Sequence, residues 1–558
     1  MSSILNVRHY NNKETLLFPP SISDFLPKDD LAHVVDEAVE EIDLTPYCKK
    51  LPQVGNPSYH PAMMIKLWFY GYATQTYSSR KIENKLSKDI AFIYLSGMQK
   101  PDFKTISEFR RKNIKELRNS FVEILQICHR LGMTKLGEIS LDSKVMKANA
   151  SASETYSKKE LQEEREIMEK AIGEYLEEAN RVDTVEDKKF GSDKRGNELP
   201  EGISRKEERI KKMKEVVKKL KKAEERLKAE DKEKINLTDS DAQFQKNKGR
   251  VIPGYRGQVA VDSEHQVVVA NDVTNEQNDA PYLIPMVEEL LENVALIQGD
   301  KNEEFKEPLH GEPIKVCADA GYSSGSNLSK LEGERYKNKI DPYIPQTNSE
   351  EKERGKGHDV SSPFHRSKFK YNKRENSFTC PCGKKLRYTG QSQKDGVKYS
   401  VYRNYCDCKV CEYFGKCTTN KNGRFIWVSE HQPLIEKMKK KLKSKEGKGV
   451  YGKRKAVVEP AIGNMSYNLG FREFLLRGTE KVRGEYSLIC TAHNLLKIRT
   501  FLKKYEVSLK EMLIYRERLA GGVYKGVILS KSWRIRERII SFFNSLSGVR
   551  VKLCCNTV

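Results

Sequence analysis

The sequence predicts an α/β protein in which a mixed sheet with flanking helices follows an all-helical domain and is interrupted by two insertions. Three observations lead to this expectation. Apolar residues recur at helical spacing from Asp24 to about Gly132, and β-branched runs alternate with helical segments between Leu136 and Pro345. A stretch rich in Lys and Glu and a stretch rich in Cys break that alternation. At 558 residues the chain is too long for one compact core, so we expect roughly two to four structural units.

Residues 1–132 are expected to form the helical domain. Apolar positions at three-and-four spacing occur in DLAHVVDEAVEEI, in PAMMIKLWFYGY after His60, and in TISEFRRKNIKELRNSFVEILQIC after Lys104. The segment from Ser78 to Gly97 is typical of two short helices, with basic residues on the first. Such a pair can place a helix in the major groove of DNA, and it is equally typical of a helical bundle with a charged outer face.

The core with the sheet is expected in residues 133–156 and 245–347. A strand from Leu136 to Ser143 is followed by two β-rich runs on either side of the turn Asp262–His265. The helix APYLIPMVEELLENV, the apolar run KVCADAGY, a helix at Ser324–Glu334 and a strand near KIDPYIP complete the series. This order predicts a mixed sheet covered by helices, which is compatible with the ribonuclease H-like arrangement.

The first insertion, residues 157–244, is dominated by Lys and Glu. Heptad-like apolar positions on either side of a break from Gly191 to Gly202 predict an antiparallel helical hairpin. A dimerisation arm, a DNA-contacting spur and a solvated charged hairpin are all compatible with this pattern. The stronger apolar series is Ile210, Met213, Val217, Leu220 and Leu227, and the weaker one is Leu161, Met168, Ile172, Tyr175 and Ala179.

The second insertion, residues 348–427, holds six cysteines, at positions 380, 382, 406, 408, 411 and 417. In a chain expected inside the cell this cluster favours a metal site over disulfides, with reduced free thiols as the alternative. A structural Zn²⁺ needs four thiolates and would hold together a segment with too few apolar residues to fold alone. We expect the zinc ligands to be Cys382, Cys408, Cys411 and Cys417. Four isolated cysteines are expected to be small buried thiols: Cys48, Cys128, Cys317 and Cys490.

Residues 428–506 are expected to be helical, and residues 507–558 form a basic tail to which the sequence assigns no function. The chain carries 101 Lys and Arg against 78 Asp and Glu, a formal net charge of +23. A surplus of this size favours a polyanionic partner, nucleic acid above all, with a merely Lys-rich surface as the alternative. No apolar run approaches the ~18 residues that span a bilayer, and the start MSSILNVRHYNNKET is charged, so we expect a cytoplasmic, nucleoid-associated protein without membrane contact.

Three acidic motifs far apart in the sequence predict the chemistry. Asp142 in ISLDSKVMKANAS and Asp319 in VCADAGYSS lie at the ends of apolar runs, and Glu459 in KRKAVVEPAIGN lies on a helical segment. Phosphodiester cleavage needs a deprotonated nucleophile and a stabilised leaving oxygen, which two Mg²⁺ ions provide together. Mg²⁺ prefers carboxylate oxygens, so these three residues are the predicted catalytic and metal-binding set, with Mg²⁺ or Mn²⁺ as the cofactor.

The motifs resemble those of DDE transposases of bacterial insertion sequences, the group with a helical N-terminal domain and a ribonuclease H-like catalytic domain. The likeness includes LDSKVMKANAS, VAVDSEHQVVVANDVTNEQND, CADAGYSS and YGKRKAVVEPAIGNMSYNLGFREFLLRGTEKVRGEYSLIC, and it covers most of the chain in the same order. It implies that Asp142, Asp319 and Glu459 are the catalytic triad and that basic residues grip the transposon end. The predicted DNA contacts are Lys144, Lys147, Tyr451, Lys453, Arg454, Lys455 and Arg472.

The chain departs from the family pattern at one position. The family's glutamate helix often carries Tyr-x-x-Arg before the Glu, as Tyr451 and Arg454 do here, and a Lys seven residues after it, where this chain has Ser466. The departure removes a phosphate contact that Lys453, Lys455 or Arg472 would have to replace. Glu485 is a rival for the third acid, although pairing with Arg483 or Lys481 is expected for it.

The resemblance implies a transposase that binds terminal inverted repeats, pairs two ends as a homodimer and joins them to target DNA with Mg²⁺. Two other functions stay open. A nuclease of the same fold would cut without joining strands, and a catalytically inactive descendant would only bind DNA.

Overall fold

The computed structural model describes residues 21–52, 54, 56–190, 201–247, 249–299, 311–346, 361–394 and 396–520. The chain divides into two compact units, Met1–Glu116 with Leu495–Val558, and Leu117–Asn494. Two long helices, α7 (Ile114–Arg130) and α16 (Thr479–Lys503), run through the boundaries between them. The part of the chain that the structure describes holds no helix with the length and apolar character required to cross a membrane.

The first unit is helical in its described residues, and the helix most deeply buried in it is α3 (Pro61–Ala73). The indole of Trp68 on α3 donates a hydrogen bond to the carbonyl of Ile106 at 3.2 Å and lies under the guanidinium of Arg110. The other helices of this unit are η1 (Ile22–Phe25), α1 (Leu31–Glu40), α2 (Thr45–Cys48), α4 (Ser79–Lys85), α5 (Ile90–Leu95), α6 (Phe103–Lys112) and α17 (Leu509–Ala520).

One expectation needs correction in this part of the chain, and the structure adds detail to two others. The helical segment after Lys104 is divided at Asn113, whose side-chain amide donates to the carbonyl of Phe109 at 2.9 Å and ends α6. Cys48 is exposed rather than buried, because it closes the four-residue helix α2 at the surface. The first residues of the expected basic tail form α17, and residues 521–558 lie outside the described residues.

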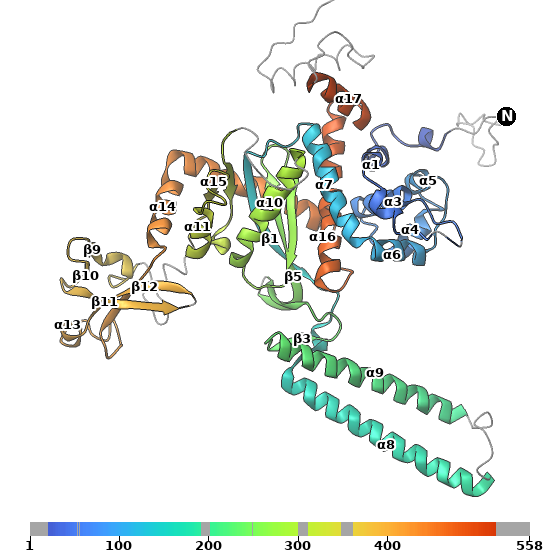
Figure 1. The fold of residues 1–558 in the computed structure, drawn as a ribbon, viewed down its shortest axis with the longest axis horizontal. Coiled ribbons are helices and arrows are strands. Elements are labelled where there is room, and N and C mark those ends of the chain that lie inside the picture. Colours follow the sequence, from blue (N-terminus) through green and yellow to red (C-terminus); the bar gives the residue numbers. More distant parts are fainter. Residues whose placement is uncertain are drawn as a thin grey trace, which may run out of the picture. The chain divides into compact units, whose positions relative to one another are not determined.

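The second unit contains a mixed six-stranded sheet (Figure 1), which confirms the predicted α/β class. The strand order is β4 (Gln243–Asn247), β5 (Arg250–Asp262), β1 (Glu138–Lys147), β7 (Ile314–Cys317) and β8 (Ile340–Tyr343), and β6 (Val268–Thr274) pairs with β5. Strands β1, β7 and β8 are parallel, whereas β5 is antiparallel to β1, β4 and β6. In the parallel half of the sheet, Asp142 lies in the middle of β1 and Asp319 follows the end of β7 by two residues.

The helices of this unit follow the predicted order. They are α10 (Leu283–Ile297), α11 (Gly325–Leu331), α14 (Gln432–Lys443), α15 (Lys445–Gly463), the π-helix η7 (Asn464–Asn468) and α16, with short turns η2 (Ala152–Glu154), η4 (Ala280–Tyr282) and η5 (Ala320–Tyr322). Helix α16 is buried through most of its length. The side-chain amide of Asn494 accepts from the backbone N–H of Val268 and donates to the carbonyl of Val268, both at 2.9 Å. A buried amide that is satisfied in this way fixes the register of α16 against β6.

The Lys- and Glu-rich insertion forms two long helices, α8 (Lys158–Phe190) and α9 (Glu201–Ala229), which lie side by side in Figure 1. The short antiparallel strands β2 (Thr155–Ser157) and β3 (Lys234–Asn236) close their base. The apolar seam at this end consists of Leu161, Leu220, Ala223, Leu227 and Ile235. Residues 191–200 of the break predicted from Gly191 to Gly202 lie outside the described residues, and α9 already includes Gly202.

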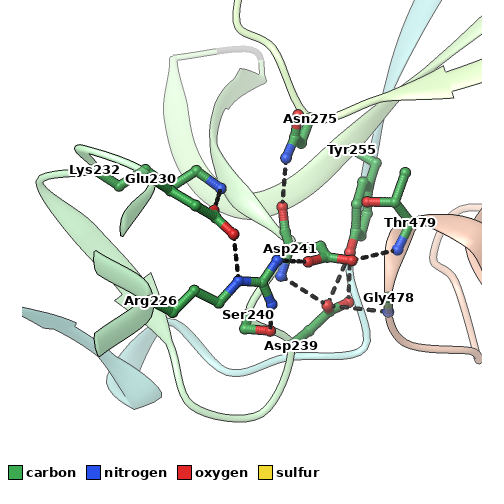
Figure 2. Close-up of polar contacts among 10 residues, drawn as sticks. All are labelled: Arg226, Glu230, Lys232, Asp239, Ser240, Asp241, Tyr255, Asn275, Gly478 and Thr479. Atoms are coloured by element: carbon green, nitrogen blue, oxygen red, sulfur yellow. Dashed lines mark hydrogen bonds and ion pairs between the residues drawn. The ribbon is translucent and has the colours of Figure 1, made fainter. Parts of the chain in front are cut away.

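Two aspartates that follow β3 join the insertion to the start of α16 (Figure 2). Asp239 accepts hydrogen bonds from the hydroxyl of Tyr255 at 2.8 Å and from the amide of Gly478 at 3.1 Å. Asp241 accepts from the amide of Thr479 at 2.7 Å and from the guanidinium of Arg226 on α9. The amides at a helix start have no partner within the helix, so two carboxylates satisfy them here from another part of the chain.

The Cys-rich insertion forms its own five-stranded antiparallel sheet in the order β13-β12-β11-β10-β9. The sheet has a small core of Phe369, Leu386, Tyr402 and Ile426. Aromatic residues on one face of a short sheet supply that core although the segment is polar on average. The elements are η6 (Arg366–Lys368), β9 (Lys370–Asn372), β10 (Ser377–Thr379), β11 (Lys385–Lys394), β12 (Val397–Asn404), α13 (Cys406–Lys409) and β13 (Arg424–Ser429).

Candidate functional site

The parallel pairing of β1 with β7 brings Asp142 and Asp319 together. Ser140 of β1 is paired with Cys317 of β7, and each aspartate follows two residues later on its own chain segment. Asp142 lies within β1 opposite Val259, and Asp319 caps the turn η5, where its carboxylate accepts from the amide of Gly321 at 2.8 Å. Because side chains alternate along a strand and both aspartates lie two residues beyond this pair, the two carboxylates leave the same face of the sheet. They are close enough for the charge of Asp319 to contribute to the raised pKa of Asp142.

Arg454 of α15 provides the counter-charge for this pair of acids. Its guanidinium lies 3.3 Å from the carboxylate of Asp142 and donates to the carbonyl of Leu141 at 3.1 Å. Burial raises the pKa of Asp142, and the positive charge of Arg454 opposes that rise. The Arg454 side chain is 8% exposed. A guanidinium buried to this extent orients Asp142. It does not present its donors to a phosphate backbone, although Arg454 was predicted to contact DNA.

Glu459 lies on the same helix but faces elsewhere. It follows Arg454 by five residues, which turns its side chain roughly 140° around the helix axis, and it is exposed. Within the described part of the chain Glu459 makes no hydrogen bond or ion pair, and its place beside the two aspartates stays a prediction. Among the described residues, no three His, Cys, Asp or Glu side chains are arranged to hold a metal ion.

Asp279 is an acidic neighbour that the sequence analysis missed. A Cβ atom on Gly321 would lie 2.9 Å from the carboxylate of Asp319 and 3.3 Å from that of Asp279, so both carboxylates lie next to Gly321. Asp279 is buried and accepts from Arg256 at 2.8 Å and from Gln258 at 3.0 Å. The sequence feature that could have identified Asp279 is its position at the end of the motif VTNEQND, just before a helix. With its oxygens engaged in this way, Asp279 supports the turn that carries Asp319.

The remaining predicted DNA contacts lie on β1, on α15 and on the segment after η7. Lys147 pairs with Glu473 at 3.2 Å and Lys453 pairs with Glu138 at 3.3 Å, while Lys455 is exposed and has no ion pair within the described residues. Tyr451 is half-buried and packs against the cluster of Cys317, Tyr343 and Val450. Lys144 and Arg472 both lie beside the ring of Tyr467.

Ser466 and Glu485 both have structural partners. Ser466 is buried in the π-helix η7 and donates its hydroxyl to the carbonyl of Ile462 at 2.7 Å. Glu485 is fully buried and accepts from the amides of Leu475 and Leu476 at 3.0 and 2.9 Å. Arg483, its expected partner, instead pairs with Asp272 at 2.8 Å. Glu485 therefore fixes the chain before α16 and is not placed to act as the third catalytic acid.

Five of the six clustered thiols line one cavity of about 30 Å³ in the Cys-rich sheet unit. They are the four predicted ligands and Cys380, whose sulfur accepts from the amide of Lys384 at 3.3 Å. Cys406 is exposed and does not line the cavity. Burial raises the pKa of Cys382 and of Cys417 to about 11. Carbon and sulfur surround most of this space, which is large enough for one water molecule or one small ion.

Two family models match the chain. Residues 379–499 match a transposase DDE domain, and residues 20–112 match a transposase domain (DUF772). No curated protein and no solved structure matches the chain. The matches confirm the predicted resemblance to a DDE-type transposase of an insertion element, and such a family implies an enzyme that acts on DNA. Glu459 lies within the first matched range, whereas Asp142 and Asp319 lie outside both.

Proposed function

We propose that this protein is a DNA transposase that binds the terminal inverted repeats of its own element, cleaves the DNA strands there and joins them to target DNA. The observation that supports the proposal is the parallel β1–β7 register, which pairs Ser140 with Cys317, two residues before Asp142 and Asp319. The mixed strand order with parallel β1, β7 and β8 supports a ribonuclease H-like catalytic core.

We propose Asp142, Asp319 and Glu459 as the catalytic carboxylates. The donor chemistry of the two aspartates fits Mg²⁺ or Mn²⁺, because both offer hard carboxylate oxygens and they lie at equivalent positions after the paired residues of β1 and β7. A divalent ion bound there would supply charge stabilisation for the transferred phosphate. Arg454 holds Asp142 in place, and the amide of Gly321 holds Asp319. Glu459 is the proposed third ligand when DNA is bound, since α15 carries it on a surface open to solvent.

Two further parts of the proposal concern partners. The helical unit that contains residues 20–112 would bind the inverted repeats, which the match to a transposase domain supports. Two copies of the chain would pair two ends in a synaptic complex. The net charge of +23 makes this binding sensitive to salt, because each neutralised phosphate releases counterions.

The test is a strand-transfer assay with DNA that carries the sequences flanking the gene. The wild-type protein should cut the ends and join them in the presence of Mg²⁺, and Asp319→Asn should abolish both steps while leaving DNA binding intact. Cutting without joining would favour the nuclease alternative. If the wild-type protein binds DNA without cutting it and Asp319→Asn behaves in the same way, the inactive descendant is favoured.

A titration with Mn²⁺ tests the third ligand. Glu459→Gln should weaken Mn²⁺ binding in the presence of DNA, whereas Asp279→Asn should not, because the carboxylate of Asp279 is engaged by Arg256 and Gln258. The reverse order of effects would replace Glu459 by Asp279 in the proposal.

We also propose a structural Zn²⁺ in the thiol-lined cavity. The support is the gathering of five sulfurs around one small space, and metal binding would draw four of them into a tetrahedral set. Elemental analysis of the purified protein should find about one zinc per chain. Cys408→Ser should lose the metal, and Cys406→Ser is the matched control that should retain it, because Cys406 lies outside the cavity. Purified protein that contains no zinc would contradict this part, and so would a melting temperature that a chelator leaves unchanged.

A further inference from the structure

Tyr467 is an exposed aromatic residue held between two cations. Its side chain lies on the π-helix η7 and the residue is 62% exposed. The ammonium of Lys144 lies 5.0 Å from the ring centre, and the guanidinium carbon of Arg472 lies 5.5 Å from it. The neighbouring large aromatics Phe471 and Phe474 are buried. The Tyr467 hydroxyl makes no hydrogen bond within the described residues, so packing in the fold does not account for this ring.

The surroundings of the ring are fixed by the backbone. The amide of Lys147 donates to the carbonyl of Arg472 at 3.3 Å, and the amide of Phe474 donates to the carbonyl of Lys147 at 2.9 Å, so this segment lies against the end of β1. Arg472 also donates through its Nε atom to the carbonyl of Ser466 at 3.2 Å, which holds the guanidinium next to η7. π-Helical turns are frequent at functional sites because they displace side chains from the regular helical surface.

The position of Lys144 links this ring to the candidate site. Lys144 follows Asp142 by two residues on β1, so both side chains leave the same face of the strand about 7 Å apart. That separation corresponds to one nucleotide step along a strand. An aromatic face accepts any base by stacking, and adjacent cations attract the phosphates on either side of it.

We propose that Tyr467, with Lys144 and Arg472, forms a stacking platform for a nucleobase of the DNA strand whose phosphate lies at Asp142 and Asp319. The inference rests on the proposed function and deepens it by naming a DNA contact that the motifs do not mark. The ring binds the base without sequence preference, and the two cations bind the flanking phosphates. This arrangement also supplies phosphate contacts in the region where Ser466 stands in place of the family's lysine.

The test measures binding of the full-length protein to a fluorescein-labelled duplex with a single-stranded overhang, and to the same DNA with abasic sites in the overhang. Tyr467→Ala should weaken binding to the normal overhang by about 5- to 150-fold, the range for loss of one stacked base. Binding to the abasic overhang should be the same for this variant and the wild type. Tyr467→Trp should bind the normal overhang at least as tightly as the wild type.

Salt dependence separates the ring from the cations. Lys144→Gln and Arg472→Gln should each lower the slope of log affinity against log salt by about 0.7–0.9, whereas Tyr467→Ala should leave the slope unchanged. The matched control is Tyr405→Ala, because Tyr405 is 47% exposed and has the ammonium of Lys409 4.2 Å from its ring centre, but lies in the Cys-rich sheet unit. This control should bind both DNAs like the wild type.

If Tyr467→Ala loses equal affinity for the normal and the abasic overhang, or loses none for either, the platform is overturned. Salt-dependent DNA binding by the wild-type protein would then still support the proposed function. A wild-type protein that binds neither DNA would overturn both. Matching melting temperatures of the Tyr467 and Tyr405 variants establish that each comparison is made on folded protein, as expected for exposed side chains.

Discussion

Replacing Arg454 by Met tests whether the buried guanidinium holds the candidate site together. The change keeps most of the side-chain volume but removes the charge next to Asp142 and the hydrogen bond to the carbonyl of Leu141. Breaking a buried ion pair by removing one partner typically costs 3–5 kcal/mol. The Asp142 side chain keeps 20% exposure, so we expect the lower end, about 3 kcal/mol.

Lys453→Met is the matched control on the same helix. Lys453 pairs with Glu138 of the same strand β1 at the same distance, 3.3 Å, but its side chain is 63% exposed and that of Glu138 is 29% exposed. An exposed pair of this kind contributes less than about 1 kcal/mol. The comparison therefore isolates burial as the cause of the difference between the two variants.

Hydrogen exchange of β1 peptides, followed by mass spectrometry, reports the free energy of opening at this strand. Arg454→Met should speed exchange of these amides about a hundredfold, corresponding to the expected ~3 kcal/mol, and Lys453→Met should speed it less than tenfold.

The penalty should also depend on pH. Burial already raises the pKa of Asp142, and removal of Arg454 raises it further. A carboxyl group with a raised pKa favours the folded state below its unfolded pKa, and that contribution is lost as pH rises through the folded value. The cost of Arg454→Met should therefore shrink in acid and in an Asp142→Asn background. Equal penalties for the Arg454 and Lys453 variants at every pH would refute the role assigned to Arg454.

Two further predictions concern the core of the same unit. A Cβ atom on Gly257 would lie 2.5 Å from the ring of Tyr486, so Gly257→Ala should lower the free energy of unfolding by roughly 1–3 kcal/mol in chemical denaturation. Gly137→Ala is the control, because no atom lies within 4 Å of its new Cβ, and it should change that free energy by no more than about 0.5 kcal/mol. Similar losses for both variants would contradict the contact. Burial raises the pKa of Glu289 from its ordinary value of 4.5 to about 7, so its contribution to stability is fully present below pH 4.5 and is lost as pH rises through about 7. Glu289→Gln should remove up to about 3 kcal/mol of that decline in thermal melts between about pH 5 and about pH 8, and an undiminished decline in the variant would exclude Glu289 as its source.

Much of the fold was predictable because hydrophobic periodicity reports local structure directly. The alternation around the turn Asp262–His265 predicted β5 and β6, and the three-and-four spacing predicted α1, α3 and α10. The break at Asn113 was missed, because a side-chain hydrogen bond that ends a helix does not interrupt the apolar pattern around it. The core of the Cys-rich sheet was missed for a related reason, since four apolar residues dispersed through a polar segment form a cluster only after the strands pair.

For the candidate site, the sequence alone determined which residues bear suitable chemistry and on which strands or helices they lie. Asp142 and Asp319 could be chosen from motifs, because a carboxylate after an apolar run is a local feature. Tertiary structure decided their alignment, since the parallel register of β1 and β7 depends on pairing between segments far apart in the chain. It also decided that Arg454 is buried, that Asp279 lies beside the Asp319 turn and that Tyr467 is exposed between two cations. Burial and electrostatic neighbours are properties of packed segments, and a linear pattern contains neither.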